Sequence, residues 1–305
     1  MKKVILYVLG LFMILNLIGC KRIEGYKYID GKVNIVATTT MLGDLAKEVG
    51  GEHVSVTTLM AVGVDPHSYV PRPSATNSVS KADLVIINGL FLEAQMGKVI
   101  STINDEKLLV IGDYFEESQL LKDEDGALDP HVWFDVENWK VATNALYNKL
   151  VSIDGDNKTY YENRVKTYLD ELTKLDNYVI DKVKELPEEK RILVTAHDAF
   201  SYFGKAYGFE VYAIQGISTE TEASAKDIQD LANLVVDLKV KAIFVESSVP
   251  ENTINSVINA AKAKEHDVVV GGELFSDSLG DEISGADTYL KMVKKNVDTI
   301  VNNLK

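Results

Sequence analysis

A single apolar stripe runs through Asp156–Leu186, near the middle of this 305-residue chain. Its members recur at alternating steps of four and three residues, with Lys182 alone interrupting the series: Tyr161, Val165, Tyr168, Leu172, Leu175, Val179 and Leu186. That spacing places them on one face of an α-helix, which Pro187 ends. One helix over this segment would be about 46 Å long, more than a small lobe needs. We therefore expect a stiff connector between two halves of the chain; the alternative is two helices broken near Asp176 and Asn177.

Short strand-like runs alternate with helix-like segments on both sides of this stripe. The expected strands are Val33–Ala37, Val54–Leu59, Asp83–Ile87 and Leu108–Ile111, then Arg191–Thr195, Phe209–Ile214, Lys241–Val245 and Asp267–Val270. Helical segments lie between them; Phe91–Ile103 is one, and Gly271-Gly272 is expected to form a turn after the last strand. Such alternation predicts parallel strands with helices on their faces. The predicted fold class is α/β, with two lobes, each a mostly parallel four-strand sheet, joined by one long rigid helix.

The first twenty residues have the pattern of an export signal. Lys2 and Lys3 precede the apolar run Val4–Ile18, which is short for a membrane span. The run closes on Leu17-Ile18-Gly19-Cys20, which resembles a bacterial lipobox. We expect Cys20, the only cysteine, to be lipidated and to anchor the protein outside the cytoplasm, on the bacterial cell membrane. An uncleaved membrane anchor with a chance cysteine is the alternative.

These patterns divide the chain into five parts. They are a lipoprotein signal peptide (1–19), a tether (20–32), an N-terminal α/β lobe (33–155), the connecting helix (156–187) and a C-terminal α/β lobe (188–305). The formal charge of −14 argues against nucleic-acid binding and suits a protein that attracts cations. A single cysteine leaves no disulfide and no thiolate metal site.

Three histidines and one aspartate are the candidate functional residues. The tripeptide Asp-Pro-His occurs twice and ends at His67 and His131; His197 and Asp277 follow strand-like runs of the second half. We expect all four just past strands, two in each half, where ligands bind in open α/β sheets. Three imidazoles and a carboxylate suit a divalent transition metal. Glu246, at another strand end, is our candidate for holding His197; the alternative is an ordinary exposed glutamate.

A lone histidine after a strand is more often a capping or surface residue, so the metal site depends on the combination. The chain has five histidines, and we assign the remaining two, His53 and His266, to the surface. In each Asp-Pro-His, proline fixes the backbone before the histidine and the aspartate can hold the loop. Ligands in separate loops have no diagnostic spacing, however, and the sequence has no H-E-x-x-H, C-x-x-C, G-x-G-x-x-G or P-loop motif. The acidic stretch Glu116–Asp129 contains no histidine and is expected to be a solvated loop.

A set of motifs from Val33 to the C-terminus resembles the metal-binding receptors of manganese and zinc ABC importers, in the TroA-like branch of solute-binding protein family 9. The motifs are Asp65-Pro66-His67, Asn88-Gly89-Leu90 with Leu92-Glu93, Asp129-Pro130-His131-Val132-Trp133-Phe134-Asp135, Thr195-Ala196-His197-Asp198-Ala199-Phe200, Glu246-Ser247-Ser248 and Gly272-Glu273-Leu274-Phe275-Ser276-Asp277. The resemblance implies two lobes joined by a rigid helix with the metal in the cleft. It assigns the ligand role to His67, His131, His197 and Asp277.

The resemblance implies a receptor that captures one Zn²⁺ or Mn²⁺ and delivers it to a permease with a cytoplasmic ATPase. Many manganese-only relatives carry Glu at the third ligand position, where this chain has His197; many zinc-dedicated relatives carry a long His-rich loop, which it lacks. We expect a monomer. We also expect no catalytic activity, because four ligands leave no obvious open coordination position for water. The alternatives are a metal-dependent surface adhesin, a metallohydrolase using the same residues, and a receptor for a chelated metal or haem.

Overall fold

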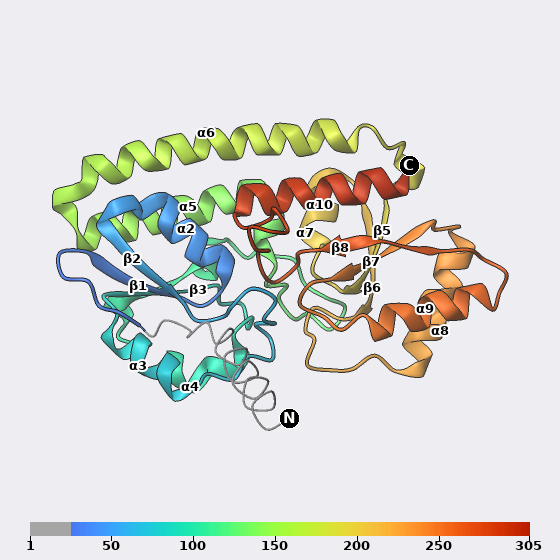
Figure 1. Cartoon of the computed structure of the whole chain (residues 1–305), viewed down its shortest axis with the longest axis horizontal. Coiled ribbons are helices and arrows are strands. Elements are labelled where there is room, and N and C mark those ends of the chain that lie inside the picture. The colour runs from blue at the N-terminus through green and yellow to red at the C-terminus, as the bar shows by residue number, and fades with distance from the viewer. Residues whose placement is uncertain (1–25) are drawn as a thin grey trace, which may run out of the picture.

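The computed structural model of the protein describes residues 26–305. The predicted signal peptide and Cys20 lie outside the described residues. Within the described range, no helix is both long enough and apolar enough to cross a membrane. Figure 1 shows two α/β lobes side by side, with one long helix, α6, running along both.

The first lobe is built on a four-stranded parallel sheet with the order β2-β1-β3-β4. Its strands are β1 (Val33–Ala37), β2 (Val54–Thr58), β3 (Leu84–Ile87) and β4 (Leu108–Val110). The accompanying helices are α2 (Thr40–Gly50), α3 (Pro73–Lys81), α4 (Gly97–Ile100) and α5 (Val136–Ile153). All residues of β1 and β3 are buried, as expected for central strands covered on both faces.

The second lobe also has four strands, hydrogen-bonded as two parallel pairs, β5-β6 and β7-β8. The strands are β5 (Ile192–His197), β6 (Glu210–Gln215), β7 (Ala242–Glu246) and β8 (Val269–Leu274). The helices are α7 (Ser201–Tyr207), α8 (Ala225–Asp237), α9 (Asn252–Lys262) and α10 (Tyr289–Leu304). Strands β5 and β7 are neighbours, but no hydrogen-bonded pairing joins the two pairs among the described residues, so the predicted four-strand sheet is here two two-stranded parallel sheets side by side.

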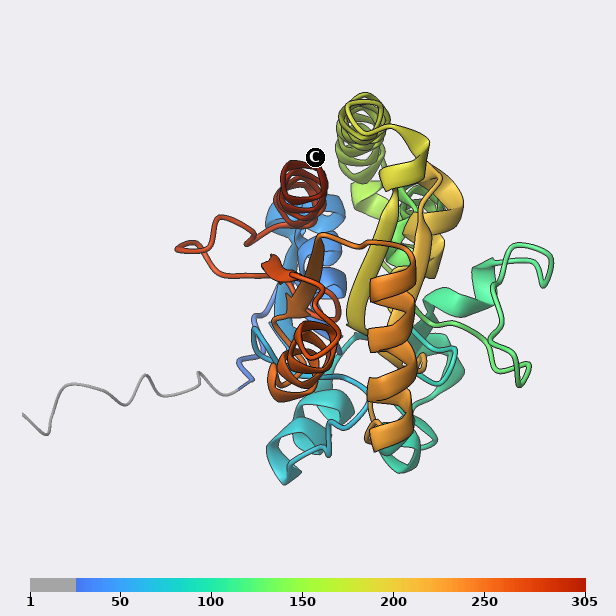
Figure 2. The ribbon, with the colours of Figure 1, turned by 90° about the vertical axis from the view of Figure 1, so that its right-hand side faces the viewer.

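Helix α6 (Lys158–Val183) is the predicted connector, and it is unbroken at Asp176 and Asn177. It packs against α2 and α5 of the first lobe and against α7 and α10 of the second. Figure 2 views the molecule from one end and shows α6 and α10 together above the strands. The stripe of α6 is buried in one hydrophobic core that includes residues of both lobes. The connection between the lobes is therefore a packed interface and not a free hinge.

Two local predictions were wrong. The expected helix Phe91–Ile103 is instead a turn, a 3-10 turn over Ala94–Met96 and the short α4. Leu90 and Phe91 have positive φ (54° and 65°), which keeps the start of this segment out of a helix. Gly271 and Gly272 lie inside β8 instead of forming a turn after it. A Cβ at Gly271 would fall 2.7 Å from the ring of Phe244, so the strand needs glycine there for close packing.

Candidate metal centre

The structure brings His67, His131, His197 and Asp277 together; these four are called the centre residues below. One possible ligand atom from each lies within 4.8 Å of the corresponding atoms of the other three. His67 lies in the loop after β2, His197 is the last residue of β5, and Asp277 follows β8. The prediction that His131 lies just past a strand was wrong, because the long acidic loop separates it from β4. It lies instead at the start of a 3-10 turn, Val132–Phe134, that leads into α5.

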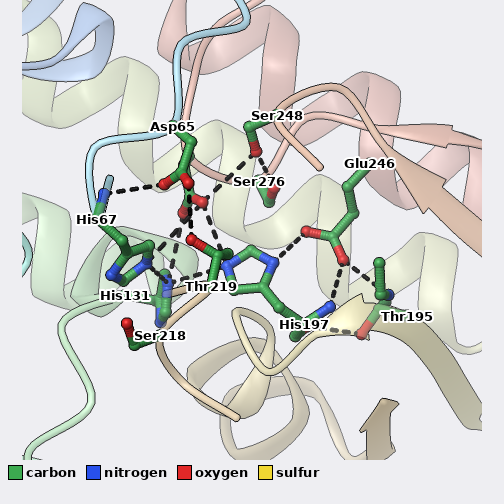
Figure 3. Close-up of polar contacts among 12 residues, drawn as sticks. Asp65, His67, His131, Thr195, His197, Ser218, Thr219, Glu246, Ser248 and Ser276 are labelled. Carbon is green, nitrogen blue, oxygen red and sulfur yellow. Dashed lines mark hydrogen bonds and ion pairs between the residues drawn. The ribbon is translucent and has the colours of Figure 1, made fainter. Parts of the chain in front are cut away.

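The three imidazole rings point their Nε2 atoms at a common space, as Figure 3 shows. Nε2 of His131 lies 3.4 Å from Nε2 of His67 and 3.3 Å from Nε2 of His197. The Asp277 carboxylate completes the group, with Oδ1 3.4 Å from Nε2 of His131 and Oδ2 3.2 Å from Nε2 of His197. Tetrahedral ligands about 2.05 Å from a shared ion are about 3.3–3.4 Å apart. Both nitrogen distances from His131 therefore match a zinc-sized tetrahedral site, whereas Nε2 of His67 lies 4.0 Å from Oδ2 of Asp277, farther than that spacing.

The centre is almost completely removed from solvent. The exposed fractions are 3% for His67, 0% for His131 and His197, and 1% for Asp277. Oδ1 of Asp277 is buried and has no hydrogen-bond partner among the described residues. Burying three imidazole rings and a carboxylate costs folding free energy unless their polar atoms have partners. One divalent cation would be a partner for all four side chains.

Carboxylates hold two of the three rings from behind. Oδ1 of Asp129 lies 2.7 Å from Nδ1 of His131. Oε2 of Glu246 lies 2.6 Å from Nδ1 of His197, a contact drawn in Figure 3. The placement of Glu246 beside His197 is the one expected from the sequence. A carboxylate at Nδ1 fixes the tautomer in which Nε2 is free to bind a metal.

The same backbone hydrogen bond occurs in each of the two Asp-Pro-His loops. The backbone N–H of His67 donates to Oδ1 of Asp65 (2.8 Å), and that of His131 donates to Oδ1 of Asp129 (2.9 Å). The predicted loop-holding role of the aspartates is confirmed. The contact of Asp129 with the His131 ring was not predicted, although the repeated tripeptide placed an aspartate two residues before each histidine.

Serine side chains beside Asp277 were also missed. The Ser248 hydroxyl lies 3.4 Å from Oδ2 of Asp277. The same hydroxyl lies 3.0 Å from the hydroxyl of Ser276. Ser248 follows β7 directly after Glu246 and Ser247, so its place at the strand end was the available signal.

Burial and charge pull the histidine pKa values apart. Burial is the main cause that lowers the pKa of His67 to about 4. Burial acts in the same direction on His131, but Asp129 and Asp277 outweigh it and raise its pKa to about 9. The pKa of His197 is likewise raised, since Glu246 and Asp277 overcome its burial. The pKa of Asp277 lies well below its ordinary value, because the two histidines outweigh the effect of burial. Asp277 is therefore ionised at neutral pH, and a metal that binds His131 and His197 must displace the protons that these rings hold in the metal-free centre.

The two remaining histidines lie away from the centre. The His53 ring packs edge-on against Tyr160, and Nε2 of His266 lies 2.8 Å from the carbonyl oxygen of Val240. Both are half-buried, more enclosed than the surface placement we expected. The acidic loop extends from the body of the protein (Figure 2) and forms one isolated bridge between Lys122 and Leu128.

Comparison with known proteins identifies the family. The sequence pattern of the family described as "ZnuA: Zinc-uptake complex component A periplasmic" matches residues 35–303. The chain is 43% identical over 273 residues to the zinc-binding protein TroA of Treponema pallidum, a match covering 89% of each chain. It is 37% identical over 297 residues to the manganese-binding lipoprotein MntA of Bacillus subtilis, covering 97% of each chain.

A solved structure shows the same fold. The periplasmic zinc-binding protein TroA from Treponema pallidum superposes with a TM-score of 0.88 at 42% identity, covering 90% of this chain and 99% of that one. Together with the buried group of three histidines and an aspartate, these matches show that the chain belongs to the ZnuA/TroA family of metal-binding receptors for ABC importers, which are substrate-binding proteins and not enzymes.

Proposed function

We propose that this receptor binds one Zn²⁺ or Mn²⁺ ion through His67, His131, His197 and Asp277. The observation that carries the proposal is the convergence of four buried ligand atoms within 4.8 Å, two from each lobe. An ion held there would join the lobes. It is the transported cargo, carried to the permease of an ABC importer with its cytoplasmic ATPase.

Of the two metals, we infer that Zn²⁺ binds more tightly to the isolated protein. The two nitrogen distances from His131, 3.3 and 3.4 Å, fit zinc, and imidazole-rich sites bind zinc more tightly than manganese. Manganese stays a candidate cargo, since relatives named for each metal match nearly the whole chain. Which ion is carried in the cell depends on metal supply as well as on affinity.

The proposed domain organisation follows from the same arrangement. Residues 33–155 and 188–305 form the two lobes, residues 156–187 connect them, and residues 20–32 tether the lobes to a lipidated Cys20 after removal of residues 1–19. This places the protein outside the cytoplasm, on the cell membrane, as a monomer that meets its permease there. The lipoprotein name of the matched Bacillus subtilis relative supports the anchor.

Capture and release should need only a small change of shape. The ligands come from both lobes, so separating the lobes slightly would break the set of ligands. Helix α6 and the core shared by the lobes oppose a wide hinge motion. We propose that the permease releases the ion by a small, local separation of the lobes.

Metal titration of the full chain, purified in mild detergent and stripped of metal, tests the proposal. Zn²⁺ and Mn²⁺ are titrated separately and in competition, beside His67→Ala and Asp277→Ala. His53→Ala is the matched control, because that histidine lies outside the centre. One equivalent of metal that is lost in both centre variants and kept in the control is expected. No binding, or binding indifferent to both centre substitutions, would refute the assigned site.

A further inference from the structure

The two Asp-Pro-His loops use their aspartates differently. Asp129 turns its carboxylate onto the ring of its own histidine, His131. Asp65 makes no such contact with His67; within residues 26–305, no carboxylate lies within ion-pair distance of the His67 Nδ1. Oδ2 of Asp65 instead accepts a hydrogen bond of 2.6 Å from the hydroxyl of Thr219, which belongs to the other lobe (Figure 3).

Thr219 lies on a segment that we call the strap, residues Gly216–Glu222, between β6 and α8. The strap is tied to its own lobe beside the centre, since the backbone N–H of Asp198 donates to the carbonyl oxygen of Gly216 (3.2 Å). It is tied to the first lobe by the Asp65–Thr219 bond and by a bond from Gln95 to Glu220. The second bond is exposed and is expected to contribute little, whereas Asp65 and Thr219 are both half-buried.

The strap borders the space from which the centre can be reached. A cavity of about 950 Å³ is lined by His67, by Leu90 and Phe91, and by strap residues that include Ile217 and Ser218. Of the four centre residues, all in the described part of the chain, only His67 lines this cavity. An ion that enters or leaves through this cavity therefore passes His67 and the strap, while Asp65 and Thr219 lie on the other side of the strap, where they line a second cavity.

We propose that the Asp65–Thr219 hydrogen bond is a clasp that holds the lobes closed and sets how long the metal stays bound. Asp65 and Thr219 act as positioning residues that do not touch the ion. Asp65 fixes the His67 backbone through Oδ1 and reaches the opposite lobe through Oδ2, so one carboxylate couples a ligand loop to closure of the cleft. This inference rests on the proposed function.

Metal release measures the effect of the clasp. The Zn²⁺-loaded full chain is mixed with an excess of a chromogenic chelator, and the release rate is followed by stopped flow. Thr219→Val removes the hydroxyl with little change of shape, and we expect release about tenfold faster, the lower end for a hydrogen bond to a charged acceptor. Association should change little, because interactions formed only on closure mainly affect dissociation.

Three further variants separate the clasp from a general effect on the strap. Thr221→Val is the matched control: Thr221 lies two residues away on the same strap, and its hydroxyl makes no hydrogen bond within the described residues. It should release at the wild-type rate, as should Thr219→Ser, which keeps the hydroxyl. In an Asp65→Asn background, Thr219→Val should accelerate release less than it does in the wild type, because the charged acceptor is already gone.

Unchanged release in Thr219→Val, or equal acceleration in Thr219→Val and Thr221→Val, would overturn the clasp. Equal acceleration by Thr219→Val in both backgrounds would also overturn it, since Thr219 would not then act through Asp65. Thermal unfolding of the metal-free variants checks that each is folded, and Thr219→Ala replaces Thr219→Val if the latter is not. If the wild-type chain binds no Zn²⁺, the proposed function fails and the clasp with it; if it binds one equivalent and only the release prediction fails, the function stands.

Discussion

Oε2 of Glu246 lies 2.6 Å from Nδ1 of His197, while Oε1 of the same carboxylate accepts a hydrogen bond of 2.9 Å from the backbone N–H of His197. One buried side chain thus fixes both the ring and the backbone of a proposed ligand. Oε1 also accepts the backbone N–H of Ala196 at 2.8 Å, so the end of β5 is held from β7. His197 cannot turn away without breaking contacts of the second lobe.

Glu246→Gln should weaken Zn²⁺ binding about 10- to 100-fold. A glutamine amide facing Nδ1 presents a donor to a ring nitrogen that must carry a proton when Nε2 binds a metal. The measurement is the Zn²⁺ dissociation constant by chelator competition. Glu273→Gln, an exposed glutamate on the neighbouring β8, is the control and should bind as the wild type does. Wild-type affinity in Glu246→Gln would contradict an orienting role for Glu246.

Glu93→Ala should lower the free energy of unfolding by about 3 kcal/mol or more. The buried Glu93 carboxylate accepts hydrogen bonds from the Thr38 hydroxyl (2.6 Å) and from the backbone N–H groups of Asn88 (2.8 Å) and Gly89 (3.1 Å). Alanine leaves the two backbone N–H groups without this acceptor, and it leaves the Thr38 hydroxyl only its longer contact with the carbonyl oxygen of Ile86 (3.4 Å). Urea unfolding of the metal-free protein measures the loss, and a loss below about 1 kcal/mol would show that water or a shifted turn replaces the carboxylate.

Glu106→Ala is the control for this experiment, because Glu106 is an exposed glutamate of the same lobe and its side chain makes no hydrogen bond within residues 26–305. A second readout follows from the neighbouring contact, in which the Asn88 side-chain amide donates to the carbonyl oxygen of Pro130 (2.9 Å), next to His131. Weaker Zn²⁺ binding should therefore accompany the loss of stability in Glu93→Ala and not in the control.

The sequence predicted the parts of the fold that depend on periodicity. The stripe of α6 and the apolar runs of β1 and β3 are buried as expected, because burial of one face of a helix or of a whole central strand leaves a pattern in the chain. The same reasoning overestimated the helix after Asn88. There, the Glu93 carboxylate stabilises a turn with positive φ at Leu90 and Phe91, a local effect that periodicity does not report.

The candidate site was predictable as a set of residue types but not as a geometry. His67, His131, His197 and Asp277 could be selected by chemistry and by family resemblance, and Glu246 by its place at a strand end. The Asp65–Thr219 bond joins residues 154 positions apart, and nothing in either segment indicates that they meet. The different roles of Asp65 and Asp129, in identical tripeptides, depend on what each loop faces in three dimensions.

Asp44→Asn should stabilise the protein near pH 7. Burial is the main cause that raises the pKa of Asp44 from 3.8 to about 6, although its carboxylate accepts the backbone N–H of Tyr289 at 2.8 Å. Asparagine keeps an acceptor for that N–H and removes the buried charge. The gain should be about 3 kcal/mol at most, because a tenfold change in the acid dissociation constant corresponds to about 1.4 kcal/mol.

The sign of the pH dependence follows from the raised pKa of Asp44. Above about pH 6 Asp44 is charged in the folded and the unfolded protein, and burying that charge lowers the free energy of unfolding by its full amount. As the pH falls from about 6 to about 4, folded Asp44 takes up a proton before unfolded Asp44 does, so this destabilisation decreases. The difference in unfolding free energy between Asp44→Asn and the wild type should therefore shrink from pH 7 to pH 4.5. A constant difference would contradict the raised pKa; the exposed Asp113→Asn serves as control.

Leu172→Ala should destabilise both lobes together. Leu172 is completely buried at the middle of α6, in the core that both lobes share. Truncation should lower the free energy of unfolding by about 2–5 kcal/mol, because it removes apolar contact and leaves a cavity.

Two signals measure the unfolding. Trp139 stacks on Tyr289 in this core, with ring centroids 4.7 Å apart, so tryptophan fluorescence reports on the shared region and circular dichroism on the whole chain. Both signals should shift to lower urea by the same amount and stay coincident, whereas Lys174→Ala, on the exposed face of α6, should change neither. Two separate transitions in the variant would mean that the lobes unfold independently, and the stiffness attributed to α6 would then have to come from elsewhere.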